Sequence, residues 1–130
     1  MISACNRRYV ETEINTTSPA RLVLALYEGA INFSLRAKRR MGEGDWAGKG
    51  ELIGKTIDIV FELNKSLDMA AGGELAANFR RLYMYCIDRL LEANMKKDPA
   101  QIDAVIRVLC TLKEGWEGVV KAETEGVLTR

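Results

Sequence analysis

The sequence predicts an all-α fold, an antiparallel up-down four-helix bundle that follows an N-terminal arm or short cap helix. Apolar residues form 48% of the 130-residue chain, which is typical of one globular domain. Aromatic residues form only 7% and there are two prolines, whereas a sandwich or barrel of short strands needs more aromatic, β-branched and turn residues. Two helix-start signals, each a polar cap residue followed by proline, occur at residues 18–19 and 98–99.

The predicted organisation has three parts. Residues 1–17 form the arm, which is polar except for a small apolar face that includes Tyr9 and Ile14. Residues 18–125 form the bundle. Residues 126–130 form a tail that we expect to fray, as chain ends usually do.

The first long helix is predicted from residue 19 to about residue 41. The Ser18 hydroxyl can cap this helix, and proline suits the first helical position because its missing N–H is not needed there. The basic run at 36–40 complements the negative end of the helix dipole. The Gly-Glu-Gly sequence at 42–44 then ends the helix.

The second helix is predicted over residues 46–69, with Asp45 as its cap and the glycine pair at 72–73 as its end. Three glycines weaken its first turns: Gly48, Gly50 and Gly54. The third helix is predicted over residues 74–95 and the fourth over residues 99–122, with Asp98 as the cap of the fourth. Because the connections are short, neighbouring helices must be antiparallel.

The composition excludes several kinds of chemistry. The chain has no histidine, so no Ser-His or Cys-His nucleophile pair and no histidine metal ligand can form. Cys5, Cys86 and Cys110 contain no CxxC pair, and the two later cysteines lie in apolar helical runs where we expect buried thiols. A carboxylate di-metal site would need histidine partners for its acidic residues. The candidates for such a site are Glu28, Asp58, Glu62 and Glu92. We therefore expect no enzyme, no metal and no cofactor.

The charge and hydropathy patterns indicate where the protein acts. The net charge of +1 argues against a nucleic-acid partner, which would require a clear basic excess. No apolar run approaches the ~18 residues of a membrane-spanning helix, and the N-terminal residues lack the apolar core of a signal peptide. We expect a cytoplasmic protein that does not insert into a membrane.

Two of the predicted helices carry wider apolar arcs than a bundle core requires. At 100° per residue, the first helix has two apolar stripes that together span about 220°. The first stripe consists of Leu22, Val23, Leu26, Ala30, Phe33 and Ala37. The second stripe consists of Leu24, Tyr27, Ile31 and Leu35. The third helix has one stripe, extended by Met84 and Leu91, that consists of Leu75, Phe79, Leu82, Tyr83, Cys86, Ile87 and Leu90.

Surplus apolar surface must be covered by something. The N-terminal arm, a second copy of the chain, or an amphipathic segment of another protein could each cover it. A bundle that buries more than the usual share of its helices would also account for it. The apolar arcs alone do not choose among these four explanations.

Several sequence strings resemble the flagellar secretion chaperone FliS family. These are TTSP at 16–19, LYEGAI at 26–31, ELNKSLD at 62–68 and GGELAAN at 72–78, and they occur in family order. Further matches follow as far as Trp116, so the resemblance covers nearly the whole chain. The LYEGAI, LNKSLD and GGE strings together are specific for the family.

The resemblance implies a cytosolic export chaperone that binds the disordered C-terminal segment of flagellin. Such a chaperone prevents premature polymerisation and assists delivery to the flagellar export gate, without catalysis. Tyr9 of the arm would cover client-binding surface when no client is present. We expect the client-binding residues to be Tyr9, Ile14, Leu24, Tyr27, Ile31, Leu35, Met84, Ile87 and Leu91.

Two aspects of assembly stay open. The free chain is expected to be a monomer or a weak dimer. The alternative function is a self-associating structural helical bundle whose extra apolar stripes form a homodimer.

Overall fold

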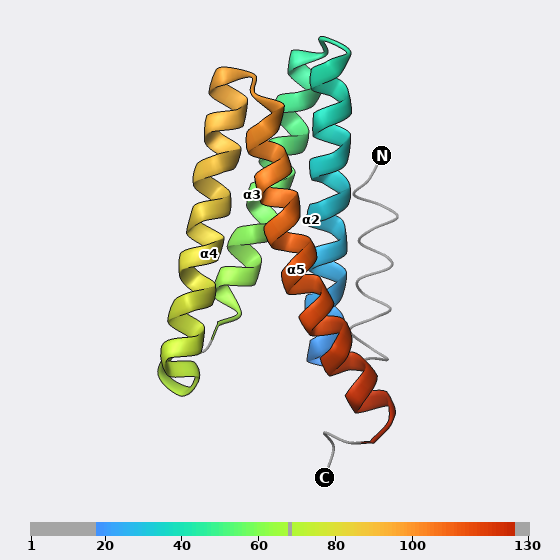
Figure 1. The fold of residues 1–130 in the computed structure, drawn as a ribbon, viewed down its shortest axis with the longest axis vertical. Helices are drawn as coiled ribbons and strands as arrows, with labels where there is room; N and C mark the ends of the chain where they lie inside the picture. The colour runs from blue at the N-terminus through green and yellow to red at the C-terminus, as the bar shows by residue number, and fades with distance from the viewer. Residues whose placement is uncertain (1–17, 68, 127–130) are drawn as a thin grey trace.

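The computed structural model describes residues 18–67 and 69–126, and within these ranges the chain forms four α-helices and no strand (Figure 1). The helices are α2 (Pro19–Gly42), α3 (Trp46–Lys65), α4 (Met69–Lys96) and α5 (Pro99–Thr124). The prediction of an all-α four-helix bundle is confirmed. Tyr9 and Ile14 of the predicted arm lie outside the described residues.

The four helices form a closed ring of neighbours. α2 packs against α3 and α5, and α4 packs against the same two helices, so that α2 and α4 face each other across a diagonal. Short turns join α2 to α3 and α4 to α5, which makes these neighbours antiparallel. In Figure 1 the C-terminal turns of α5 continue past the start of α2.

The predicted helix caps are confirmed at three helices. The Ser18 hydroxyl accepts from the Arg21 N–H at 3.3 Å, and the Asp45 carboxylate accepts from the Gly48 N–H at 2.9 Å. At the start of α5 the Asp98 carboxylate accepts from the Ala100 N–H at 3.0 Å. Each cap satisfies one of the N–H groups that have no partner inside the helix.

The connection between α3 and α4 differs from the prediction. α3 ends at Lys65, and Ser66 caps it: the Ser66 hydroxyl donates to the Leu63 carbonyl oxygen at 2.7 Å, and the Ser66 N–H donates to the Glu62 carbonyl oxygen. The chain then begins α4 before the glycine pair. Gly73 interrupts the first turns of α4 with φ 53° and ψ −128°, a conformation that only glycine adopts readily.

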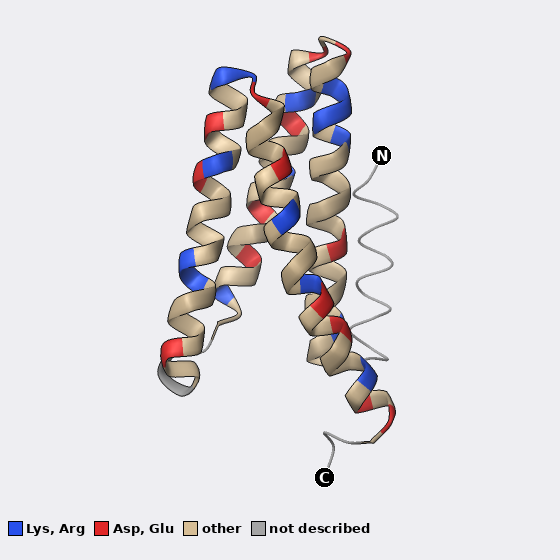
Figure 2. Cartoon of the chain, viewed as in Figure 1, with Lys and Arg blue, Asp and Glu red and all other residues tan. Residues whose placement is uncertain are grey.

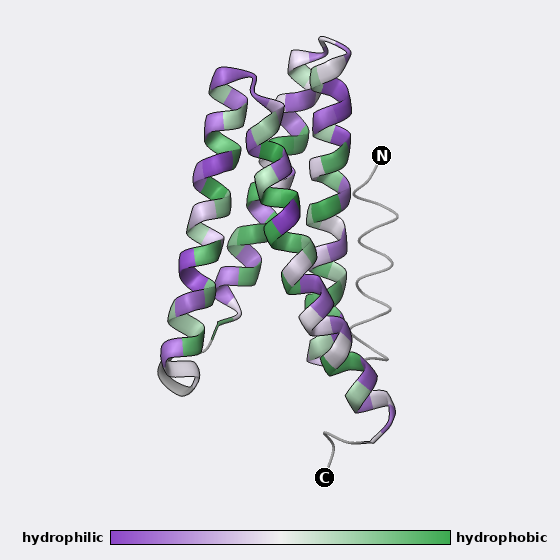
Figure 3. Cartoon of the chain, in the orientation of Figure 1, coloured by the Kyte–Doolittle hydropathy of each residue, from purple (hydrophilic) through white to green (hydrophobic). Residues whose placement is uncertain are grey.

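The core lies along the axis of the bundle and draws on all four helices. Its most deeply buried large side chains are Tyr27, Tyr83, Ile53, Leu63, Leu90, Ile102 and Leu109. The hydroxyls of Tyr27 and Tyr83 share a hydrogen bond of 2.5 Å, which joins the two diagonal helices α2 and α4 through the core. Hydrophobic residues recur along every helix (Figure 3).

Candidate protein-binding surface

Large apolar side chains are exposed mainly on α4. Six of the nine exposed ones among the described residues belong to this helix: Leu75, Leu82, Met84, Tyr85, Leu91 and Met95. The other three are Leu35 on α2 and Trp46 and Phe61 on α3. α5 contributes none to this group. An apolar surface of this kind on one helix is typical of a protein-binding site.

Contacts with neighbouring helices show which way the two flanks of α4 face. Lys49 of α3 donates to the side-chain oxygen of Asn94 at 2.6 Å and to its carbonyl oxygen at 3.1 Å. On the other side, Arg89 donates to Gln101 of α5 at 3.0 Å. At 100° per residue, the Asn94 side carries three exposed apolar residues, Met84, Leu91 and Met95. The Arg89 side carries Leu75 and Leu82.

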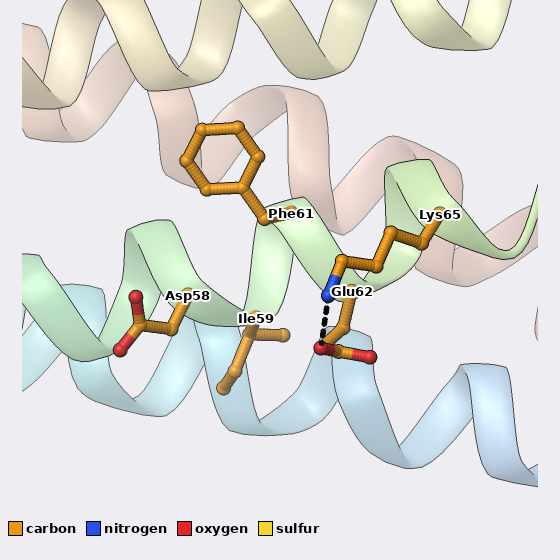
Figure 4. A pocket seen from close by; sticks show the side chains of 5 residues that line it. All are labelled: Asp58, Ile59, Phe61, Glu62 and Lys65. Carbon is orange, nitrogen blue, oxygen red and sulfur yellow. Dashed lines mark hydrogen bonds and ion pairs between the residues drawn. The ribbon is translucent and has the colours of Figure 1, made fainter.

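α3 extends the apolar surface of the Asn94 side. Phe61 is 44% exposed, and its ring lies on the side of α3 that faces α4 (Figure 4). Ile57, one turn earlier on this side, is partly buried against the core. At Gly54, an added Cβ would meet no atom within 4 Å, so the surface there is open. We call Phe61, Met84, Leu91 and Met95 the α3–α4 tract.

A smaller apolar surface lies on α2. Leu24 and Ile31 are half-buried, and Leu35 is 51% exposed. These three residues, which we call the α2 flank, lie on the side of α2 that faces α5, where Lys38 pairs with Asp103 at 2.8 Å.

Two of the predicted client-binding residues are buried, so their expected outward positions are wrong. Tyr27 has no exposed surface, because its ring crosses the core towards Tyr83 with ring centres 6.5 Å apart. Ile87 lies one turn after Tyr83 on the same inner face and is also buried. Leu24, Ile31, Leu35, Met84 and Leu91 keep accessible surface, and their role in binding stays a prediction.

Sequence reasoning missed part of this surface. Phe61 and Met95 were not expected to contribute. Phe61 lies well away from the arc of buried α3 residues that includes Ile53 and Val60, and this offset is the signal that identifies it. Met95 follows Leu91 by one turn on the same flank. No pattern in the sequence predicts the open surface at Gly54, because this surface depends on which side chains of α4 lie near it in the folded chain.

Burial keeps one thiol and two phenol groups of the core in their neutral forms. Burial raises the pKa of the Cys86 thiol from its ordinary value near 9 to about 12. It also raises the pKa of the Tyr27 and Tyr83 hydroxyls. None of these three groups therefore exchanges a proton near neutral pH. In the described ranges, no three Cys, Asp or Glu side chains lie together so that they could hold a metal ion.

A depression on the outer face of α3 is lined by Asp58, Ile59, Phe61, Glu62 and Lys65 (Figure 4). All five side chains come from one helix, so the depression is open to solvent. An ion pair of 3.3 Å between Lys65 and Glu62 neutralises one end of it. The depression forms the outer edge of the α3–α4 tract, because Phe61 belongs to both.

None of the described helices combines the length and the apolar character needed to cross a membrane.

Comparison with known proteins shows which protein family this chain is similar to. The family profile described as "Flagellar protein FliS" matches residues 1–123. A flagellar secretion chaperone FliSB from Pseudomonas aeruginosa is 39% identical over 110 residues, which cover 85% of this chain and 87% of the relative. The flagellar secretion chaperone FliS of Salmonella typhimurium is 37% identical over 111 residues (85% and 82%). That of Vibrio cholerae is 32% identical over 118 residues (91% and 87%).

Proposed function

The chain belongs to the FliS family of flagellar secretion chaperones, and we propose that it binds the disordered C-terminal segment of flagellin. We further propose that it prevents premature polymerisation in the cytoplasm and assists delivery to the flagellar export gate. The resemblance predicted from the sequence strings is confirmed. Membership of a chaperone family implies a flagellar protein as partner and a binding function rather than catalysis.

The observation that carries this proposal is the exposed apolar surface of α4. Full burial of a leucine or methionine side chain contributes roughly 1.5–3 kcal/mol. Leu91 is 50% exposed and Met95 is 75% exposed, so a client that covers the surface recovers a substantial part of that energy at each position. Ordering a disordered segment costs about 2–5 kcal/mol. The exposed apolar side chains of α4 supply burial energy that acts against this cost.

Two surfaces support a client that contacts more than one side of the bundle. The α3–α4 tract lies between α3 and α4, and the α2 flank lies beside α5. A flexible segment can follow both surfaces, whereas a rigid globular partner would meet only one of them. We propose that the arm, with Tyr9 and Ile14, covers part of this surface in the free chain, which is then a monomer or a weak dimer.

Calorimetric titration of the full chain with a flagellin C-terminal segment tests the proposal. We expect saturable binding with a negative heat-capacity change, since apolar surface is buried. Leu91→Glu should weaken binding at least tenfold, because the new charge loses its water on docking. Thr111→Glu is the matched control, because it adds the same charge to an exposed position on α5. Equal affinity of both variants would contradict the assignment of the surface.

The oligomeric state separates the proposed function from the alternative. Mass measurement of the free chain and of its mixture with the flagellin segment gives this state directly. A dimer that the segment does not dissociate would favour a self-associating structural bundle. A chain that forms a one-to-one complex with the segment supports the chaperone function.

A further inference from the structure

The α3–α4 tract has an acidic outer border. Asp58 precedes Phe61 by one turn of α3, and both side chains line the depression shown in Figure 4. Asp88 lies on α4 between Met84 and Leu91, on the outer side of the same flank. Both carboxylates are exposed, and neither belongs to an ion pair within the described part of the chain.

Most other charges around the tract are already neutralised. Glu62 pairs with Lys65 at 3.3 Å, and Glu92 pairs with Lys96 at 3.1 Å. Glu51 pairs with Lys55 at 3.5 Å. Asp58 and Asp88 therefore leave two uncompensated negative charges beside the middle of the tract.

Basic residues limit this acidic stretch at one end. Arg80 and Arg81 lie on α4 before Met84, towards the start of the helix, and both are exposed. Arg81 donates to Asn78 within α4. The border is thus acidic at Asp58 and Asp88 and basic towards the start of α4. Bands of both charges are visible along α4 in Figure 2.

The shape of the tract suits a helix. Gly54 leaves backbone uncovered on the α3 side, and no atom lies within 4 Å of the position a Cβ would take. Gly50, one turn before Gly54, has the Asn94 side-chain oxygen of α4 3.7 Å from its Cβ position. Leu91 and Met95 are exposed on the same flank of α4 as Asn94 and are one helical turn apart. An apolar helix face can approach the α3 backbone closely there, between exposed side chains of α4 and Phe61.

We propose that the α3–α4 tract docks an amphipathic helix whose apolar stripe is bordered by lysine or arginine side chains that pair with Asp58 and Asp88. This inference rests on the proposed function, because it names the chemistry of the client segment that this surface accepts. The apolar stripe supplies affinity, and the basic border supplies selection between clients.

The charges disfavour a second copy of the chain as the occupant. A two-fold symmetric dimer would place the same surface of both copies in contact. The uncompensated carboxylates of the two tracts would then approach one another, and like charges repel. A partner helix that places its basic side chains beside Asp58 and Asp88 meets no such repulsion at these two positions, whereas the end of the tract beside Arg80 and Arg81 does not favour a basic residue.

Two synthetic helical peptides with identical leucine stripes test the proposal, one with lysine and the other with glutamate beside the stripe. Each is titrated into the full chain at low salt. We expect the lysine peptide to bind about tenfold more tightly than the glutamate peptide. Added salt should narrow this difference, because the border is exposed to solvent. Equal affinity of the two peptides, or no binding of either, would overturn the proposal.

Variants of the full chain assign the effect to the tract. The double change Asp58→Asn and Asp88→Asn should abolish the preference for lysine, and circular dichroism should show an unchanged fold because both side chains are exposed. The matched control is Glu114→Gln with Glu117→Gln, two exposed acids on α5, which should keep the preference. Gly54→Leu should weaken both peptides by filling the opening. If the double aspartate variant still prefers the lysine peptide, the preference arises from another part of the protein and the proposal is refuted.

The same variants separate this inference from the proposed function. If the flagellin segment binds and the aspartate changes leave its affinity unaltered, the acidic border is not used and only this inference fails. If the lysine peptide shows its aspartate-dependent preference and the flagellin segment does not bind, only the proposed function fails. A stable dimer of the free chain that Leu91→Glu dissociates would identify a second copy as the occupant and overturn the proposal.

Discussion

The diagonal helices α2 and α4 start from the same sequence feature and place it differently. Both carry apolar arcs wider than one core face. On α2 the surplus is mostly absorbed: Tyr27 is fully buried, Ile31 packs against the core, and Leu35 is the one large apolar side chain of this helix that is exposed. On α4 the surplus stays outside, with six exposed large apolar residues.

This difference shows that the adjacent helices, rather than the width of the apolar arc, decide which apolar side chains are buried. α2 lies closer to α3 and α5 along its length than α4 does. Tyr27 is long enough to reach Tyr83 across the bundle, where its hydroxyl finds a partner. Leu91 and Met95 are on a flank where α3 offers the open surface at Gly54 instead of a covering side chain.

A matched pair of tyrosines gives the largest test of this comparison. Tyr27→Ala should destabilise the protein by about 3–5 kcal/mol, because it removes a buried aromatic ring and leaves the Tyr83 hydroxyl without its partner. Tyr85→Ala, at the 44% exposed tyrosine of α4, should change stability by no more than about 0.5 kcal/mol. Urea unfolding followed by circular dichroism measures both. Similar losses of stability in the two variants would contradict the proposed difference between α2 and α4.

Alkaline pH probes the inner face of α4. The folded protein raises the pKa of Cys86 from about 9 to about 12, so the folded state retains this proton more strongly than the unfolded state. The stability that results is complete below about pH 9 and is lost as the pH rises towards 12, at up to ~1.4 kcal/mol per pH unit for each such group. Tyr27 and Tyr83 add losses of the same sign above about pH 10.

Unfolding free energies of the wild type and of Cys86→Ala between pH 8 and pH 11, roughly the range in which thiols and phenols ionise, check this prediction. The variant should be less stable at pH 8 but should lose stability more slowly above pH 9. A pH dependence identical to that of the wild type would show that Cys86 is accessible to water in the folded state.

The interruption at the start of α4 sharpens the comparison further, since α2 has no counterpart. Gly73→Ala should destabilise the protein by about 1–2 kcal/mol, because its positive φ is costly for any residue with a Cβ. Gly42→Ala is the control, because Gly42 lies at the end of α2 without a positive φ and with no atom near its Cβ position. Thermal unfolding of both variants gives the comparison, and an unchanged midpoint for Gly73→Ala would contradict it.

The smallest expected change is a gain in stability rather than a loss. Gly54→Ala should stabilise the protein by about 0.5–1 kcal/mol, because alanine lowers the backbone entropy of the unfolded chain and meets no atom in the folded one. Chemical denaturation of this variant measures the gain. A loss of stability would mean that the surface beside Leu91 is closed, and α4 would then resemble α2.

Local signals explain why most of the fold was predictable from the sequence. Ser18, Asp45 and Asp98 each act on N–H groups within their own first turn, so the starts of three helices follow from short stretches of sequence. The end of α3 was not predictable in this way, because Ser66 and Gly73 offer two competing breaks within a few residues. Which break ends the helix depends on how the turn packs.

The site was less predictable, because a helical wheel gives an angle and no neighbours. Tyr27 was expected to face a client with Ile31 and Leu35, but its longer side chain reaches the opposite helix and is buried. Cys86 is buried as expected, whereas Cys110 is only half-buried on α5. Phe61 was missed because a single exposed aromatic residue on α3 does not by itself indicate a binding surface. It does so only together with the exposed Met84 and Leu91 of the neighbouring helix.

The diagonal hydrogen bond also has a consequence for the order of folding. Tyr27 and Tyr83 are 56 positions apart, whereas the turns between α2 and α3 and between α4 and α5 bring together residues that are close in sequence. Closing a long loop costs more entropy than closing a short one, so the two helical hairpins should form before the diagonal contact. Loss of the contact through Tyr27→Phe should then leave the folding rate nearly unchanged and accelerate unfolding. The buried tyrosine pair would thus set how long the native state lasts rather than how quickly it is reached.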